Sequence, residues 1–130
     1  MLGSGSAGNS ALVATDHCKI LVDGGLSARQ AVLRLEQCGL TPEQLDGVVV
    51  THEHTDHICG LEVLCHKFEL PIYCNRLTAE ALRSTGLANR CRNWRSRTLA
   101  ERLSDLRRHA CATGEGQGDP IEVAPCRNAP

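Results

Sequence analysis

The chain carries three histidines and one aspartate within six residues, directly after a short apolar segment. The apolar segment is Gly-Val-Val-Val at 47–50, and the polar run is Thr-His-Glu-His-Thr-Asp-His at 51–57. A run of β-branched residues predicts a strand that other elements cover on both faces. Such a strand places the polar run at one edge of a sheet, so this stretch constrains the possible folds more than any other.

The four side chains of this run have the chemistry of metal ligands. His52 and His54 are two residues apart on an extended segment, so both rings can project to one side and bind one ion at ~2.0–2.1 Å. Asp56 and His57 follow where a helix is expected to begin, and they can approach a second ion from another direction. Such ions activate water, and two of them can stabilise both oxygens of a phosphodiester displacement. The alternative is a solvated loop that happens to be rich in histidine.

A second segment, Gly-Ser-Gly-Ser-Ala-Gly-Asn-Ser at 3–10, has the G-x-G-x-x-G spacing of dinucleotide-binding loops. That fold needs a strand before the glycines and a helix directly after them. Almost nothing precedes the first glycine, and residues 11–22 contain two strand-like runs instead. We therefore interpret the glycines as a tight turn between strands, with Asn9 in left-handed backbone geometry. Contact of Ser4, Ser6 or Asn9 with a substrate is left open.

The rest of the pattern alternates short strands with helices. Apolar runs bounded by turn residues predict strands, and capping residues followed by apolar periodicity predict helices. Strands are expected at 11–15, 19–23, 47–51 and 72–75. Helices are expected at 27–38, 58–68 and 79–85, the last one capped by Thr78, and a single helical turn is expected within 41–46. This order predicts an α/β (α+β) domain with a mainly aliphatic core, because the chain has only three aromatic residues.

Composition narrows the class of protein further. The chain has 130 residues and a formal charge of −1, which argues neither for nor against a polyanionic partner. Its longest apolar runs are about four residues, so neither a membrane span nor an export signal is expected. The eight cysteines are widely spaced, without a C-x-x-C pair. We therefore expect free thiols and a cytoplasmic location.

Three motifs in order resemble the metallo-β-lactamase-fold hydrolases, in particular a bacterial exonuclease-like branch associated with cell-wall metabolism. The motifs are LGSGSAGNS at 2–10, ILVDGGLS at 20–27 and LDGVVVTHEHTDHICGL at 45–61. The similarity covers about residues 2–94. It implies the N-terminal half of a four-layer αββα sandwich that holds two divalent metals, zinc or manganese, between its sheets. It also implies hydrolysis, with phosphodiesters in DNA as the expected substrate.

The resemblance assigns roles to the residues of the polar run. It implies that His52 and His54 bind the first metal and that Asp56 and His57 bind the second. Asp56 is also the candidate catalytic residue.

Two further residues are implied to support the metal loop without binding metal themselves. They are Asp23, at the end of a strand, and Thr51, directly before the histidines. For Asp23 the alternative is a simple turn-forming role.

The resemblance also implies ligands from a second half of the domain, but nothing after Trp94 matches them. Instead, residues 90–108 contain seven arginines, and the end is rich in glycine and proline. We expect 1–94 to be the N-terminal half of the domain and 95–130 to be a divergent tail, with one helix and then disorder. Our hypothesis is that the reading frame departs near Trp94 and that the strand normally preceding residue 2 is clipped.

An incomplete metal site follows from this organisation. Four ligands shared between two ions give each ion about two protein donors, fewer than the three usual at catalytic zinc. We therefore expect weak metal affinity and little turnover from this chain alone. The alternative is a non-catalytic fragment that binds nucleic acid or a protein partner through its arginine-rich segment. The oligomeric state is left open.

Overall fold

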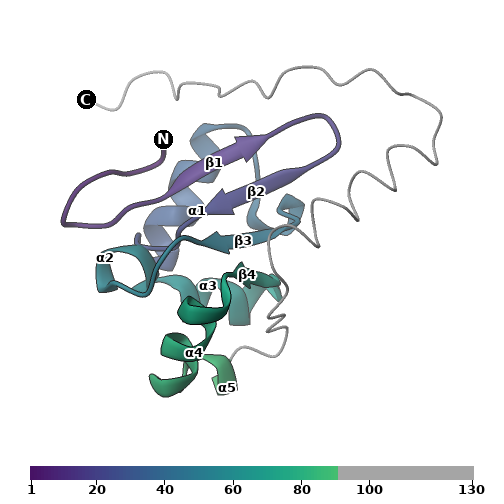
Figure 1. Cartoon of the computed structure of the whole chain (residues 1–130). Coiled ribbons are helices and arrows are strands. Elements are labelled where there is room, and N and C mark those ends of the chain that lie inside the picture. The colour runs from purple at the N-terminus through teal and green to yellow at the C-terminus, as the bar shows by residue number, and fades with distance from the viewer. Residues whose placement is uncertain (91–130) are drawn as a thin grey trace.

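A four-stranded mixed sheet forms the centre of the computed structural model, which describes residues 1–90 (Figure 1). The strands follow chain order across the sheet: β1 (Ala11–Ala14), β2 (Lys19–Val22), β3 (Gly47–Val50) and β4 (Ile72–Cys74). β1 and β2 are antiparallel, whereas β2, β3 and β4 run parallel. The tail expected at 95–130 lies outside the described residues.

Helices connect the parallel strands, as parallel pairing requires. The connection from β2 to β3 contains α1 (Ala28–Gln37) and the 3₁₀ turn η1 (Pro42–Gln44). The connection from β3 to β4 contains α2 (Thr55–Ile58) and α3 (Leu61–Phe68), and β4 leads into α4 (Arg76–Ser84) and α5 (Leu87–Arg90). Ser27 begins α1 as expected, since its hydroxyl oxygen accepts the Gln30 N–H at 3.3 Å.

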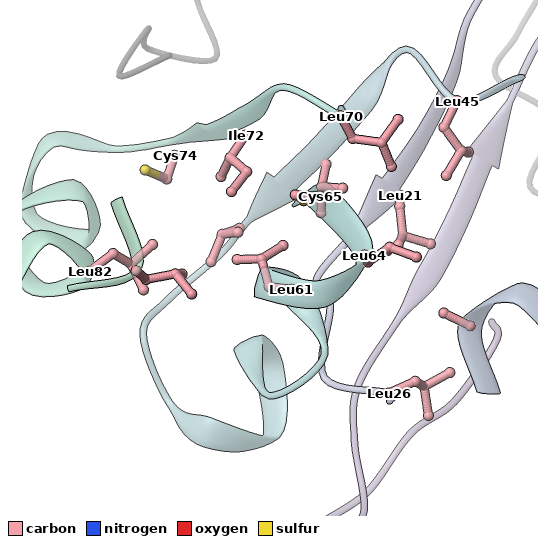
Figure 2. Close-up of a cluster of buried hydrophobic side chains, with 14 of the residues drawn as sticks. Leu21, Leu26, Leu45, Leu61, Leu64, Cys65, Leu70, Ile72, Cys74 and Leu82 are labelled. Atoms are coloured by element: carbon pink, nitrogen blue, oxygen red, sulfur yellow. The ribbon is translucent and has the colours of Figure 1, made fainter. Parts of the chain in front are cut away.

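The core lies between one face of the sheet and the helices (Figure 2). Its largest fully buried side chains are aliphatic and come from the strands, α1, α3 and α4: Leu21, Val48, Val50, Ile72, Leu35, Leu61, Leu64 and Leu82. Burial of each such side chain contributes about 1.5–3 kcal/mol relative to exposure. This core therefore fixes the positions of the strand ends from which the polar run emerges.

The single helix expected at 58–68 is wrong, because the structure has two helices, α2 and α3, separated at Gly60. The Gly60 N–H donates to the Gly24 carbonyl oxygen at 2.9 Å. A Cβ at Gly60 would lie 1.8 Å from the carbonyl oxygen of Leu26, so only glycine fits there. Close packing of these two backbone segments ends α2 and sets the direction of α3.

The start of α4 also differs from the expectation of a helix at 79–85. The helix begins at Arg76, and its capping residue is Asn75, whose Oδ1 accepts the Thr78 N–H at 2.8 Å. Thr78, the expected cap, is buried inside the helix. Asparagine directly after a strand is a strong capping residue, so the helix can start as soon as β4 ends.

The glycine-rich segment forms a closed loop between Gly3 and Ser10, which pair as an antiparallel bridge. The left-handed backbone geometry lies at Gly5 (φ 119°) and Gly8 (φ 138°), so its expected placement at Asn9 is wrong. Because these two glycines adopt the left-handed geometry, Asn9 does not need to. The segment leads into β1 rather than into a helix. The structure therefore agrees with a turn and not with a dinucleotide-binding loop.

Candidate metal site

The polar run meets the end of β2 at one edge of the sheet. Val22 of β2 pairs with Val49 of β3, and the Asp23 N–H donates to the Val49 carbonyl oxygen at 2.8 Å. Asp23 and Thr51 therefore follow neighbouring parallel strands and lie side by side. This edge, at the carboxyl ends of parallel strands, is where open α/β sheets place their ligand sites.

The Asp23 carboxylate lies behind the polar run and is nearly buried, since the residue is 5% exposed. Oδ1 accepts the Thr51 N–H at 2.8 Å, and the Thr51 hydroxyl lies 2.8 Å from Oδ2 and 3.0 Å from Oδ1. Oδ2 also lies 2.8 Å from Nδ1 of His57. Asp23 has φ 63°, a left-handed geometry that aspartate tolerates better than most residues. It therefore makes a turn and also holds two residues of the polar run.

These contacts fix which ring nitrogens point away from Asp23. An ionised carboxylate only accepts hydrogen bonds, so Nδ1–H of His57 and the Thr51 hydroxyl both donate to it. Nδ1 of His52, 3.0 Å from the Thr51 oxygen, then donates to that oxygen. In the neutral form of both rings, Nε2 is then the nitrogen without a proton. Histidines that bind metal through one ring nitrogen usually donate a hydrogen bond from the other. Here the acceptor is the Asp23 carboxylate for His57 and the Thr51 hydroxyl for His52.

The three imidazoles lie close together. The ring centroid of His52 is 4.6 Å from that of His54 and 3.9 Å from that of His57. His54 is the N-cap residue directly before α2, and its carbonyl oxygen accepts the His57 N–H at 2.8 Å. The sharp change from extended strand to helix therefore brings residues 52, 54 and 57 to one side of the loop.

Asp56 completes the group of polar side chains. Its Oδ2 lies 3.5 Å from Nε2 of His57, and its side chain is about one-third exposed. The Asn9 amide nitrogen lies 2.8 Å from the same Oδ2 and 3.2 Å from Nε2 of His57. Sequence analysis missed this role of Asn9. A polar residue that ends a glycine-rich loop is a weak signal, and only the folded loop shows its partners.

The donor set fits a divalent cation in kind. Imidazole nitrogen and carboxylate oxygen are the usual ligands of zinc. Two ligands of one tetrahedral ion lie roughly 3.3 Å apart when each bond is ~2.0–2.1 Å, and Asp56 Oδ2 and His57 Nε2 are 3.5 Å apart. Among residues 1–90, however, no three His, Cys, Asp or Glu side chains converge as one complete metal site would require.

A cavity of about 440 Å³ adjoins Asp56. It lies between the glycine-rich loop and α2, and its lining residues are Ser6, Ala7, Gly25, Thr55, Asp56 and Cys59. This volume is within the usual range for small-molecule sites. The glycine-rich loop therefore forms one wall of a space that reaches the candidate ligands.

Comparison with protein families decides the assignment of this chain. The model of the metallo-beta-lactamase superfamily matches residues 3–121. The chain belongs to the metallo-beta-lactamase superfamily. This confirms the resemblance and the fold class expected from the sequence, and the match extends beyond residue 94 into residues that the structure does not describe.

Curated relatives share the same part of the superfamily fold. The exodeoxyribonuclease YycJ of Bacillus anthracis is 46% identical over 82 residues, which cover 63% of this chain and 31% of that protein. The exodeoxyribonuclease WalJ of Streptococcus pneumoniae is 41% identical over 85 residues, covering 65% of this chain and 32% of that protein. The anti-Pycsar protein Apyc1 of Saccharibacillus brassicae is 43% identical over 68 residues. The chain thus spans about a third of the length of the two exodeoxyribonucleases.

Solved structures of the superfamily agree with the fold. A metallo-beta-lactamase of Cronobacter sakazakii has a TM-score of 0.55 and 26% identity, with 59% of this chain and 32% of that chain covered. A B3 metallo-beta-lactamase with an active-site glutamic acid has the same TM-score and 29% identity, with 59% and 30% covered. Within the described residues, no helix has the length and apolar character needed to cross a membrane.

The structure brings all six residues singled out by sequence into one neighbourhood. Asp23 contacts Thr51 and His57, Thr51 contacts His52, and the rings of His52, His54 and His57 adjoin one another, with Asp56 beside His57. Their roles as metal ligands, catalytic residue and supporting residues stay predictions.

Proposed function

We propose that this chain carries the first part of the two-metal site of a hydrolase that acts on phosphodiesters, with DNA as the substrate. Membership of the superfamily supports the reaction class, and the names of the two exodeoxyribonuclease relatives support the substrate. The single observation that carries the proposal is the Asp23 network, in which Asp23 contacts Thr51 and Nδ1 of His57, and the Thr51 hydroxyl contacts Nδ1 of His52. Histidines that serve only as solvated loop residues need no such buried carboxylate.

Each residue has a proposed role. His52 and His54 would hold the first ion, and Asp56 and His57 would hold the second. Thr51 would orient the ring of His52, and Asp23 would orient the ring of His57. When bound, divalent ions act as Lewis acids and lower the pKa of water to ~7. Asp56 is proposed as both ligand and catalytic residue because its carboxylate borders the cavity beside the glycine-rich loop.

We further propose that affinity for metal is weak and turnover slow when this chain acts alone. The described residues provide four candidate ligands, and no three of them converge on one point. A cytoplasmic location belongs to the same proposal, since no disulfide joins the cysteines within residues 1–90.

A nuclease assay tests this function. The purified chain is incubated at high concentration with labelled DNA and Mn²⁺ or Zn²⁺, and compared with His54→Ala and with His66→Ala, an exposed histidine on α3. We expect slow, metal-dependent cleavage that is lost in His54→Ala and retained in His66→Ala. Cleavage that survives in His54→Ala contradicts the proposal, as does salt-sensitive DNA binding without cleavage at any metal concentration.

A further inference from the structure

The Asn9 amide group lies between the two residues proposed to hold the second ion. Its nitrogen is 2.8 Å from Asp56 Oδ2, 3.2 Å from His57 Nε2 and 3.2 Å from the carbonyl oxygen of Gly5. Its oxygen accepts the Gly5 N–H at 3.0 Å. Both ends of the amide are therefore engaged, which fixes its orientation: the oxygen faces the loop and the NH₂ group faces the pair.

Asp56 and His57 need such a donor because the two atoms that face each other are both acceptors. An ionised carboxylate oxygen only accepts hydrogen bonds, and in a neutral His57 ring whose Nδ1 donates to Asp23, Nε2 also accepts. Two acceptors 3.5 Å apart repel each other unless a donor or a cation lies between them. An NH₂ group has two hydrogens, so at most two of its three neighbouring acceptors receive one: Asp56 Oδ2, His57 Nε2 and the Gly5 carbonyl oxygen. The contact with Asp56 is the shortest of the three. The Asn9 NH₂ group therefore lies within hydrogen-bond distance of both atoms.

The backbone of Asn9 holds the amide in this position. The Asn9 N–H donates to the Asp56 carbonyl oxygen at 2.7 Å, and the Asn9 carbonyl oxygen accepts the Gly25 N–H at 3.0 Å. A Cβ at Gly25 would lie 1.7 Å from the Asp56 carbonyl oxygen and 2.6 Å from the Asn9 nitrogen. The three backbones pack so closely that the glycine-rich loop cannot shift without moving α2.

We propose that Asn9 is a positioning residue that keeps Asp56 and His57 at the spacing of a divalent-cation site before the cation arrives. The inference rests on the proposed function, since it assumes that this pair binds metal. On binding, Nε2 of His57 must release the amide, but the shorter contact with Asp56 can persist because a carboxylate oxygen has two lone pairs. Without Asn9, the partly exposed Asp56 carboxylate loses the contact that orients it toward His57.

Zinc affinity of the full chain, measured by titration calorimetry with Zn²⁺ alone, tests this role. We expect Asn9→Ala to bind Zn²⁺ about 10-fold more weakly than the wild type, the usual effect of losing a group that orients a ligand. The matched control is Asn75→Ala, which removes the asparagine that caps α4 and should leave the affinity unchanged. Equal affinity of Asn9→Ala and wild type would overturn the role of Asn9, and absence of binding by the wild type would overturn the proposed function with it.

A second measurement uses the wild type only, so it does not depend on the variant folding. The side-chain amide signals of Asn9 are followed by NMR during the same Zn²⁺ titration. We expect them to shift at the same Zn²⁺ concentration as the ring signals of His57, because the amide must leave Nε2 when the cation binds. If the Asn9 signals stay constant while those of His57 shift, the inference is contradicted. That result is the one expected if Asn9 only stabilises the loop.

Discussion

The carboxylate of Asp23 and the ring of His57 are joined by a 2.8 Å hydrogen bond between Oδ2 and Nδ1. The bond links two elements that are 34 positions apart in the chain, the end of β2 and the short helix α2. It fixes the ring position and the protonated nitrogen of His57 together. The proposed metal chemistry of the loop therefore depends on a residue that is itself too buried to reach the metal.

Replacement of Asp23 by asparagine is expected to disturb His57 more than the small change in shape suggests. The substitution keeps a residue that tolerates the left-handed geometry at φ 63°. If the amide nitrogen faces Nδ1, the ring must move its proton to Nε2, which then cannot bind metal. We expect a loss of about 10–100-fold in Zn²⁺ affinity and of about 1–3 kcal/mol in the free energy of unfolding, measured by calorimetry and urea denaturation.

Asp46→Asn is the control for this experiment. Asp46 is exposed, and its Oδ2 accepts the Lys19 N–H at 2.7 Å, so the variant also weakens one hydrogen bond to a backbone amide. Asp46→Asn should lower the free energy of unfolding without changing the affinity for Zn²⁺. If the two variants lose affinity equally, Asp23 has no specific effect on His57.

Removal of the Thr51 hydroxyl is expected to affect His52 in the same way. Thr51→Val keeps the branched shape but removes the oxygen that lies 2.8 Å from Asp23 Oδ2 and 3.0 Å from His52 Nδ1. We expect about 1 kcal/mol less stability and a lower Zn²⁺ affinity, whereas Thr51→Ser should restore both. Unchanged affinity in Thr51→Val would show that the hydroxyl does not orient His52.

Two neighbouring glycines should respond very differently to alanine. At Gly25 the new Cβ would lie 1.7 Å from the Asp56 backbone oxygen, whereas at Gly24 its nearest contact is Leu61 Cδ1 at 3.0 Å. A backbone atom cannot yield, but a leucine methyl group can rotate. We expect Gly25→Ala to cost about 2–4 kcal/mol and Gly24→Ala about 1 kcal/mol in urea denaturation. Similar costs would contradict the close packing of the glycine-rich loop on α2.

The buried thiol of Cys74 provides a prediction about pH. Burial raises its pKa above the ordinary value of 9.0, and the positive charge of Arg83 offsets part of that effect. The folded chain therefore keeps this proton when the unfolded chain loses it. The protonated Cys74 thiol therefore makes its full contribution to the free energy of unfolding below about pH 9. This contribution is lost as the pH rises through the higher pKa of the folded state.

Urea denaturation from about pH 8 to about pH 10 measures this effect, with Cys74→Ala as the reference. The wild type should lose stability more steeply with rising pH than Cys74→Ala, because only the wild type carries this thiol. Parallel pH profiles would show that burial does not perturb the thiol.

The strand positions and the clustering of the candidate ligands follow directly from the sequence. The Val run before Thr51 has one structural solution, a covered strand, and the strand end dictates where His52 and His54 emerge. The acid at position 23 could be placed at a strand end by the same reasoning. These features are local, so period and composition are enough to predict them.

The break at Gly60 and the contacts of Asn9 do not follow from sequence. Both arise where two backbone segments distant in the chain approach closely, Gly24 to Leu26 against Gly60 and Gly25 against Asn9 and Asp56. A local sequence pattern can indicate that a glycine is needed, but it does not identify the distant backbone segment that packs against it. The start of α4 at Arg76, with Asn75 as its cap, does not follow from the sequence for another reason. Asn75 and Thr78 are both good capping residues, and the tertiary packing of Thr78 decides between them.

Co²⁺ binding followed by visible absorption tests the account most directly, because the spectrum reports nitrogen ligation at the histidine cluster. We predict a saturable, weak spectrum for the full chain that is lost when His52 and His57 are both replaced by alanine and is unchanged in His66→Ala. The same spectrum in the double variant, or no saturable spectrum in the wild type, would contradict the claim that this loop binds divalent cations.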